Sequence, residues 1–165
     1  MFEDENQQPF TAIQWFNKGY DYDILEDYDN AIFAYTKAIE LNPQDADAYI
    51  NRGVIYDVQG EYDLAIMDYT KAIELEPLDA DTYINRGVIY DNKGKCDFAL
   101  ADYNKALELQ PEDADVYYMK AALCDTLGYK SEAKEAYKFF IRYAPAADPN
   151  IEKARQQIKE LGGTI

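Results

Sequence analysis

The chain of 165 residues contains no histidine and only two cysteines, Cys96 and Cys124. The lack of histidine excludes His-based catalytic triads, imidazole general bases and the commonest transition-metal ligand. The cysteines are separated by 27 residues, which fits no zinc-binding motif. Glycine-rich phosphate loops and nucleophile motifs are also missing. We therefore predict no enzymatic activity, no metal and no other cofactor.

Long apolar runs are missing as well. No stretch approaches the roughly 18 consecutive apolar residues that a membrane span requires, and residues 1–8 contain neither the basic region nor the apolar run of a secretion signal. These absences predict a cytoplasmic protein that does not insert into a membrane. In a cytoplasmic chain we expect both cysteines to be small buried core residues; a disulfide or redox switch is the less favoured alternative.

Basic residues are scarce: 16 Lys and Arg face 32 Asp and Glu, which gives a net charge of −16. Nucleic acids and anionic membrane surfaces are bound mainly by Lys and Arg, so neither is an expected partner. Hydrophobic residues nevertheless make up 48% of the chain and aromatic residues 15%. This composition is typical of a folded protein and not of an acidic disordered tail.

The sequence is internally repetitive. Shifted by 34 residues, it superimposes on itself without a gap, which defines four repeats: 12–45, 46–79, 80–113 and 114–147. The second and third repeats are identical at 22 of 34 positions. Self-similarity at this period predicts an array of short structural units.

Within the repeats, similar residues recur at helical spacing in two stripes. The first stripe consists of Trp15, Tyr49, Tyr83 and Tyr117, then Gly19, Gly53, Gly87 and Ala121, then Tyr22, Tyr56, Tyr90 and Cys124. The second consists of Ala31, Ala65, Ala99 and Ala133, then Tyr35, Tyr69, Tyr103 and Tyr137, then Ala38, Ala72, Ala106 and Phe140. Each repeat is therefore predicted to be a helical hairpin in which large aromatics of one helix lie over Gly or Ala of the other.

Turn residues agree with these hairpins. Glycines separate the two helices in repeats two to four, whereas Glu26 takes that place in the first repeat. Prolines follow each second helix, and aspartates precede the next first helix as predicted N-caps. These positions are Gly60, Gly94 and Gly128; Pro43, Pro77, Pro111 and Pro145; Asp45, Asp79 and Asp113.

The columns resemble the tetratricopeptide repeat, a 34-residue helix-turn-helix module, over residues 12–147. The resemblance implies an all-α fold: an α-solenoid of four repeats in a right-handed superhelix, with the first helices lining a concave groove. Outside the repeats we predict a flexible acidic N-terminal tail over 1–11 and a C-terminal capping helix and tail over 148–165. The capping helix is expected from Asp148, as N-cap, to residue 162, and its apolar stripe consists of Ile151, Ala154, Ile158 and Leu161. Asp21 is polar where the later repeats have Ile or Leu. We therefore expect its face of the first repeat to have no preceding repeat packed against it.

Three sets of residues, the groove columns, are expected to face the concave side. The amide column holds Asn17, Asn51 and Asn85. An amide both donates and accepts hydrogen bonds, so such a column suits the backbone of an extended peptide, and members of the family that the chain resembles use asparagine ladders in this way. Alternatively, these amides bond only to the neighbouring helix.

The apolar groove column includes Ile50, Ile84, Val54, Val88 and Tyr118, which would accept apolar side chains of a ligand or would serve only to pack one repeat on the next. The acidic column consists of Asp23, Asp57, Asp91 and Asp125. These carboxylates lie near the C-terminus of each first helix, where the helix dipole disfavours negative charge. They either select a basic partner, or they are solvated or paired with a nearby lysine.

One further column, Lys18, Arg52, Arg86 and Lys120, replaces a leucine usual in the family. Arg occurs only where the second helix carries Asp68 or Asp102, so we predict the ion pairs Arg52–Asp68 and Arg86–Asp102. The chain as a whole is predicted to be a protein-interaction scaffold that holds a peptide segment of a partner protein in its groove. The alternative is a homo-oligomer that associates head to tail through its acidic front and more basic rear.

Overall fold

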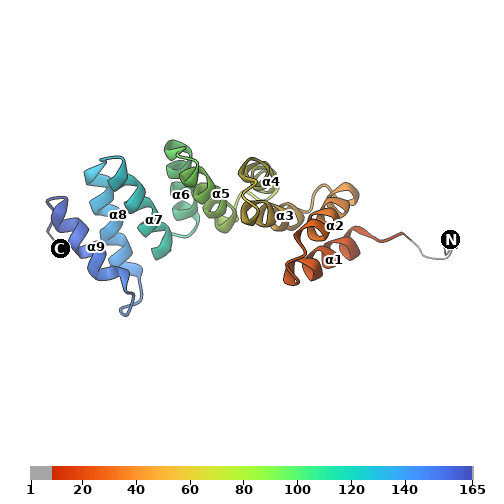
Figure 1. The fold of residues 1–165 in the computed structure, drawn as a ribbon. Coiled ribbons are helices and arrows are strands. Elements are labelled where there is room, and N and C mark those ends of the chain that lie inside the picture. The colour runs from red at the N-terminus through yellow and green to blue at the C-terminus, as the bar shows by residue number, and fades with distance from the viewer. Residues whose placement is uncertain (1–8, 165) are drawn as a thin grey trace. The chain divides into compact units, whose positions relative to one another are not determined.

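The structure is a computed structural model that describes residues 9–164. This part of the chain contains nine α-helices and no strand, arranged as four helical hairpins and a final helix (Figure 1). The helices are α1 (Ala12–Ile24), α2 (Tyr28–Leu41), α3 (Ala46–Val58), α4 (Tyr62–Leu75), α5 (Ala80–Asn92), α6 (Cys96–Leu109), α7 (Ala114–Thr126), α8 (Lys130–Tyr143) and α9 (Asn150–Glu160). The predicted all-α fold of hairpin repeats is confirmed. Of the predicted acidic tail, residues 1–8 lie outside the described residues.

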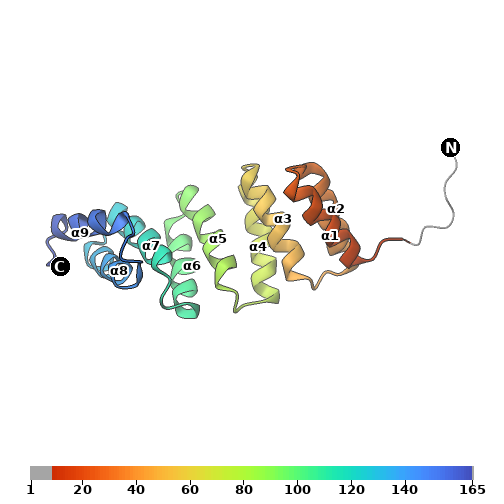
Figure 2. The same cartoon turned by 90° about the horizontal axis from the view of Figure 1, so that it is seen from below.

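The chain divides into two compact units, the first ending at Pro77 and the second beginning at Leu78. Unit 1 contains the hairpins α1–α2 and α3–α4, and α2 also packs against α3. Unit 2 contains the hairpins α5–α6 and α7–α8, with α6 packed against α7 and α9 packed against α8. Figure 2 shows the paired helices of each unit side by side.

Close contact between the helices of the first three hairpins depends on a glycine under a tyrosine ring. A Cβ atom at Gly53 would lie 3.0 Å from the ring of Tyr69, and one at Gly19 would lie 2.7 Å from the ring of Tyr35. Tyr35 and Tyr69 are almost completely buried. The predicted packing of large aromatics over small residues is therefore confirmed. It explains why Tyr35 and Tyr69 are core residues.

The turns inside the hairpins adopt left-handed backbone conformations. Gly60, Gly94 and Gly128 have φ angles of 76°, 68° and 76°, which glycine adopts without steric cost. In the first hairpin Glu26 occupies this place with φ 57°. The first turn therefore keeps the geometry of the others despite its Cβ atom, a conformation that costs an L-residue about 1–2 kcal/mol.

The helix caps follow the predicted aspartates. The side chains of Asp45, Asp79 and Asp113 accept hydrogen bonds from backbone N–H groups in the first turns of α3, α5 and α7. The last helix begins later and ends earlier than predicted, spanning Asn150–Glu160 with Pro149 at its N-cap position. The prediction of Asp148 as the N-cap is therefore wrong by one residue, although its Oδ1 accepts a 2.7 Å hydrogen bond from the N–H of Asn150.

The residues at the two ends of the repeat array differ in their burial. Ile151, Ala154 and Ile158 of α9 are buried against Ala136 and Phe140 of α8, so this helix covers the apolar end of unit 2. In unit 1, Ile55 packs against Ala31 and Tyr35 of the preceding repeat. Asp21, which stands in the same column as Ile55, is exposed.

The cysteines differ from each other. Both are free thiols; Cys124 is buried, and burial raises the pKa of its thiol. Cys96 is only half-buried at the start of α6, where its sulfur lies 3.6 Å from the carbonyl oxygen of Gly94. The prediction that both are buried is therefore wrong for Cys96, which is the first residue of α6.

Candidate functional site

The amide column has free hydrogen-bonding capacity. Asn17 on α1 is exposed, while Asn51 on α3 and Asn85 on α5 are half-buried. None of the three side chains forms a hydrogen bond with another part of the chain that the structure describes. Each amide therefore keeps two donors and an acceptor for water or a ligand, and the predicted alternative of a bond to the neighbouring helix is not formed.

The apolar groove column is partly accessible. Val54 is exposed over 37% of its surface, and Ile50, Ile84 and Val88 are half-buried. Tyr118 is different, because its ring packs edge-on against Tyr137 and beside Phe140, with centroids 6.0 and 5.0 Å away. Tyr118 thus contributes to the core of the last hairpin, and only its remaining surface is available to a ligand.

The acidic column is half-buried and has no cationic partner. Asp23, Asp57, Asp91 and Asp125 are each the last residue but one of a first helix. No Lys or Arg within the described residues forms an ion pair with any of them. Burial raises the pKa of Asp57 and of Asp91 above its usual value. The alternative of pairing with lysine is therefore not formed, and burial disfavours the charged form of Asp57 and Asp91.

These carboxylates also influence the tyrosines of the second helices. Burial raises the pKa of Tyr137 to about 12, and the negative charge of Asp125 adds to the effect. Burial and Asp57 likewise raise the pKa of Tyr69. A cationic ligand group beside the acidic column would relieve both effects, because it would favour the charged carboxylate and offset its field at the phenol.

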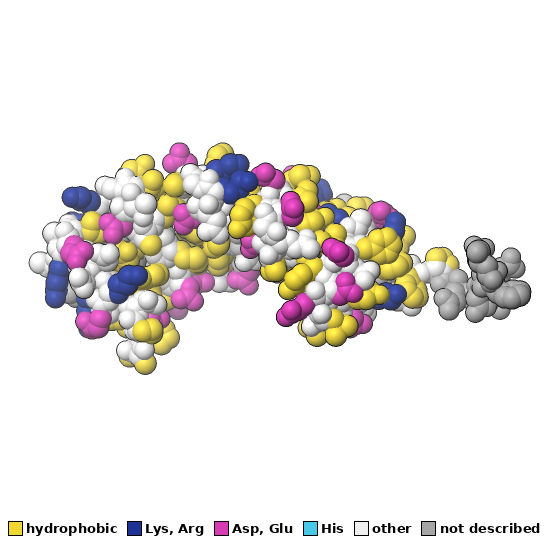
Figure 3. All heavy atoms as spheres, in the orientation of Figure 1, with side chains coloured by type: hydrophobic (Ala, Val, Ile, Leu, Met, Phe, Trp, Pro, Cys, Tyr) yellow, Lys and Arg dark blue, Asp and Glu magenta, His cyan; other side chains and the backbone are white. Residues whose placement is uncertain are grey.

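The residues of the groove columns lie on the first helices of the hairpins, two such helices in each unit. In unit 1, α1 carries Asn17 and Asp23, α3 carries Asn51 and Asp57, and these two helices are in contact. In unit 2 the same columns continue on α5 and α7, where Met119 takes the place of the asparagine in the fourth repeat. Acidic and apolar side chains are interspersed on the face of each unit that Figure 3 shows.

The predicted ion pairs are present and are bidentate. Nε and Nη2 of Arg52 each donate a 2.8 Å hydrogen bond to the carboxylate of Asp68, and Arg86 binds Asp102 with bonds of 2.9 and 2.8 Å. Nη1 of Arg52 also donates a 2.9 Å bond to Oγ1 of Thr36 on α2. The sequence reasoning missed Thr36, which links the first repeat to the second.

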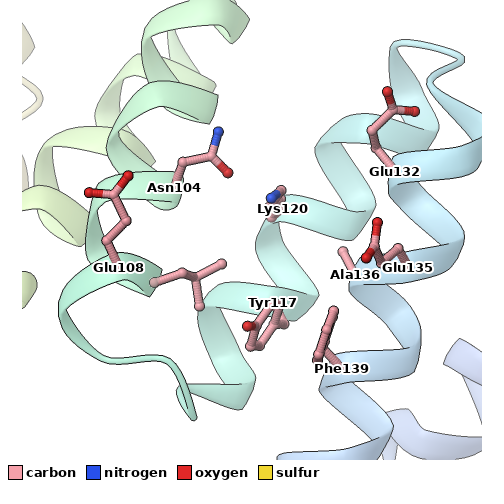
Figure 4. A pocket seen from close by; sticks show the side chains of 9 residues that line it. Asn104, Glu108, Tyr117, Lys120, Glu132, Glu135, Ala136 and Phe139 are labelled. Carbon is pink, nitrogen blue, oxygen red and sulfur yellow. The ribbon is translucent and has the colours of Figure 1, made fainter.

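The fourth repeat has a cavity in the position of this cluster. The cavity has a volume of about 470 Å³ and is surrounded by α6, α7 and α8 (Figure 4). Its lining consists of Asn104, Leu107, Glu108, Tyr117, Lys120, Glu132, Glu135, Ala136 and Phe139. The sequence analysis did not single out this site, although the change from Arg and Asp to Lys120 and Ala136 was the signal for it.

Two other properties concern the described part of the chain. None of its helices has both the length and the apolarity to cross a lipid bilayer. Residues 9–164 also contain no group of three or more Cys, Asp or Glu side chains arranged to hold a metal ion.

Solved structures similar to this chain contain the same repeat. The crystal structure of MamA protein superimposes with a TM-score of 0.82 and 25% identity over 91% of this chain and 80% of that one. The first TPR of Spaghetti (RPAP3), bound to the HSP90 peptide SRMEEVD, is 26% identical with a TM-score of 0.68, over 72% of this chain and 94% of that one. A tetratricopeptide repeat protein from Parabacteroides merdae shares the fold, with a TM-score of 0.84 and 21% identity over 92% of this chain and 60% of that one.

No curated protein matches the sequence. Two profiles of the tetratricopeptide repeat do match it, one over residues 12–45, 46–78 and 80–113 and the other over 114–146. The matched segments coincide with the four hairpins α1–α2, α3–α4, α5–α6 and α7–α8. The chain therefore belongs to the tetratricopeptide repeat family.

Proposed function

We propose that the protein is a non-enzymatic interaction scaffold that binds an extended segment of a partner protein along its groove columns. The observation that carries this proposal is the set of asparagine amides, two of them half-buried, that have no hydrogen-bond partner among the described residues. A half-buried amide without a protein partner costs stability unless water or a ligand satisfies it. The peptide complex of the first TPR of Spaghetti supports the proposal, since that similar domain binds a peptide.

We propose further that the partner segment is basic. The four carboxylates of the acidic column have no cationic partner in the described part of the chain, and burial disfavours their charge at Asp57 and Asp91. The first two repeats carry net charges of −5 and −6, the third −3 and the fourth +1. The electrostatic attraction for a basic segment is therefore strongest at the first two repeats.

The test uses an array of basic, neutral and acidic nonapeptides, followed by calorimetric titration of the best binder. Replacement of Asn51 and Asn85 by Ala is expected to weaken binding about tenfold or more, because hydrogen bonds to the peptide backbone are lost. The matched control replaces Gln59 and Asn92, which are exposed amide side chains outside the groove columns, by Ala. Unchanged affinity in the Asn51/Asn85 variant, with helicity retained, would show that the groove columns do not bind the peptide.

Self-association is a second candidate function, and it is favoured by the uneven charge of the chain. Residues 1–79 carry a net charge of −14, whereas residues 80–165 carry −2. Head-to-tail contact of the acidic front with the less acidic rear would weaken as salt rises. Sedimentation velocity between 0.02 and about 0.5 M NaCl tests this; a monomer throughout the series would exclude self-association.

We also propose that the protein works in the cytoplasm. Its two cysteines are both free thiols, and free thiols are typical of a reducing compartment.

A further inference from the structure

The cavity of the fourth repeat has a counterpart in the second repeat that is filled. Because the repeat period is 34 residues, Asn104, Lys120 and Ala136 stand where the first two repeats have Thr36, Arg52 and Asp68. There the guanidinium of Arg52 binds both side chains and lies 5.9 Å from the ring centroid of Tyr49. The second repeat thus shows that this position in the fold suits a guanidinium held by a carboxylate beside a tyrosine ring.

The fourth repeat retains the ring but contains a different set of charges. Tyr117 is the counterpart of Tyr49, and its ring stacks on Phe139 with centroids 4.9 Å apart. Glu132 and Glu135 replace Leu64 and Met67, so two carboxylates are added to the lining while Asp68 has no counterpart. The nine lining residues carry a net charge of −2, whereas their nine counterparts in the first two repeats carry a net charge of zero.

The charged groups of the lining are largely unpaired. Glu108 forms an ion pair with Lys105, whose Nζ lies 2.9 Å from Oε2 of Glu108. Glu132, Glu135 and Lys120 form no ion pair with any residue in the range 9–164. Figure 4 shows the two glutamates on α8, facing α6 across Lys120 and Tyr117 of α7. Arg142 already lies over the ring of Phe139, 5.3 Å from its centroid. The unpaired charged groups of the lining are thus Glu132, Glu135 and Lys120, beside the ring of Tyr117, which also stacks on Tyr143 with centroids 5.8 Å apart.

From these observations we propose that the cavity binds an arginine side chain of a partner protein, with its guanidinium paired to Glu132 and Glu135 and its methylenes against Tyr117. The excess negative charge favours a cation over an anion, and a planar guanidinium fits two carboxylates and an aromatic face better than an ammonium does. The pairing would supply from a partner the guanidinium that Arg52 supplies within the second repeat.

This site is separate from the groove columns. No residue of the groove columns lines the cavity. At 3.6 residues per turn, Lys120 projects about 140–160° around the axis of α7 from Tyr118 and Asp125, and Tyr117 about 80–100° from them. Binding in the cavity therefore does not depend on the proposed groove, and one experiment distinguishes the two.

The experiment is an NMR titration of the full-length, ¹⁵N-labelled protein with the peptide Gly-Gly-Arg-Gly-Gly, acetylated and amidated, at low ionic strength. The control peptide has citrulline, the neutral isostere, in place of arginine. We expect shifts concentrated in residues 104–108, 117–120 and 132–139, and an affinity at least about tenfold weaker for the citrulline peptide. Equal affinity for both peptides would overturn the proposal.

Substitutions in the cavity and elsewhere test where the arginine peptide binds. Glu132→Gln with Glu135→Gln should reduce affinity about tenfold, whereas Glu152→Gln with Glu160→Gln, an identical change of charge on α9, should not. Lys120→Arg with Ala136→Asp should rebuild the ion pair of the second repeat and abolish binding while the thermal midpoint is maintained or rises. Asn51→Ala with Asn85→Ala should leave the arginine peptide's affinity unchanged. Equal losses in both glutamate pairs, or shifts confined to the groove columns, would contradict the site.

Discussion

The interhelical ion pair Arg52–Asp68 offers a sharp test of what stabilises the repeats. Nη2 of Arg52 lies 2.8 Å from Oδ1 of Asp68. The side chain of Arg52 is only 16% exposed and that of Asp68 only 7%. The pair lies in the same unit as Lys71–Glu74, an i,i+3 pair on the surface of α4 with side chains 41% and 61% exposed. The perturbations are Asp68→Asn, Arg52→Met and the double variant, with Lys71→Met, Glu74→Gln and their double variant as the matched control.

The expected magnitudes follow from burial. Asp68→Asn leaves the charge of Arg52 without its counter-ion, and breaking a fully buried pair costs about 3–5 kcal/mol. Since Arg52 retains some exposure and its bond to Thr36, we expect the free energy of unfolding to fall by about 2–4 kcal/mol, with a coupling energy of about 2 kcal/mol in the double-mutant cycle. The exposed pair on α4 should show a coupling energy of about 0.3–0.5 kcal/mol.

The assay is urea unfolding followed by circular dichroism at pH 7, at low salt and at 0.5 M NaCl. The coupling energy of Arg52–Asp68 should change little with salt because solvent ions are excluded from the pair, whereas that of Lys71–Glu74 should approach zero. The cycle for Arg86 and Asp102 repeats the measurement in unit 2, where the bonds are 2.9 and 2.8 Å long. Equal coupling in the buried and exposed pairs would refute the argument that burial determines their contribution.

Two further predictions concern single positions. Glu26→Gly should raise the free energy of unfolding by about 1 kcal/mol, because it removes the Cβ atom from a residue with φ 57°. Gly60→Ala, at φ 76°, should lower the free energy of unfolding by about as much. Urea midpoints that shift in the same direction in both variants would contradict the backbone argument. Asp57→Asn should raise stability at pH 7, where the carboxylate is charged at a cost. Because burial raises the pKa of Asp57 in the folded state, the native protein gains stability as the pH falls through that pKa, so the advantage of the Asn variant should shrink and vanish below the usual value of 3.8. Thermal midpoints of both proteins from pH 7 to about 3 measure this, and a difference that is constant with pH would rule out the carboxylate's charge as its cause.

Much of the fold could be predicted because it depends on local or periodic features. Glycine under tyrosine, aspartate before a helix and glycine in a turn each act within one hairpin, so one repeat's pattern predicts the others. The Arg52–Asp68 pair was predictable for the same reason, since both residues change together between repeats. The groove columns could be assigned to a helix face, whereas their lack of partners became visible only in the structure.

Tertiary structure decided the features that depend on contacts between successive repeats. The bond from Arg52 to Thr36 requires α2 to pack against α3, which no pattern within one repeat specifies. The cavity of the fourth repeat likewise arises where α6, α7 and α8 meet and the filling arginine and aspartate are absent. The absence of histidine and the excess of acid thus limited the chemistry of this protein from its sequence alone. The places where that acid is unpaired, Glu132 and Glu135 among them, were decided by the packing of helices, because an ion pair depends on the distance between side chains in space and not on their spacing in the sequence.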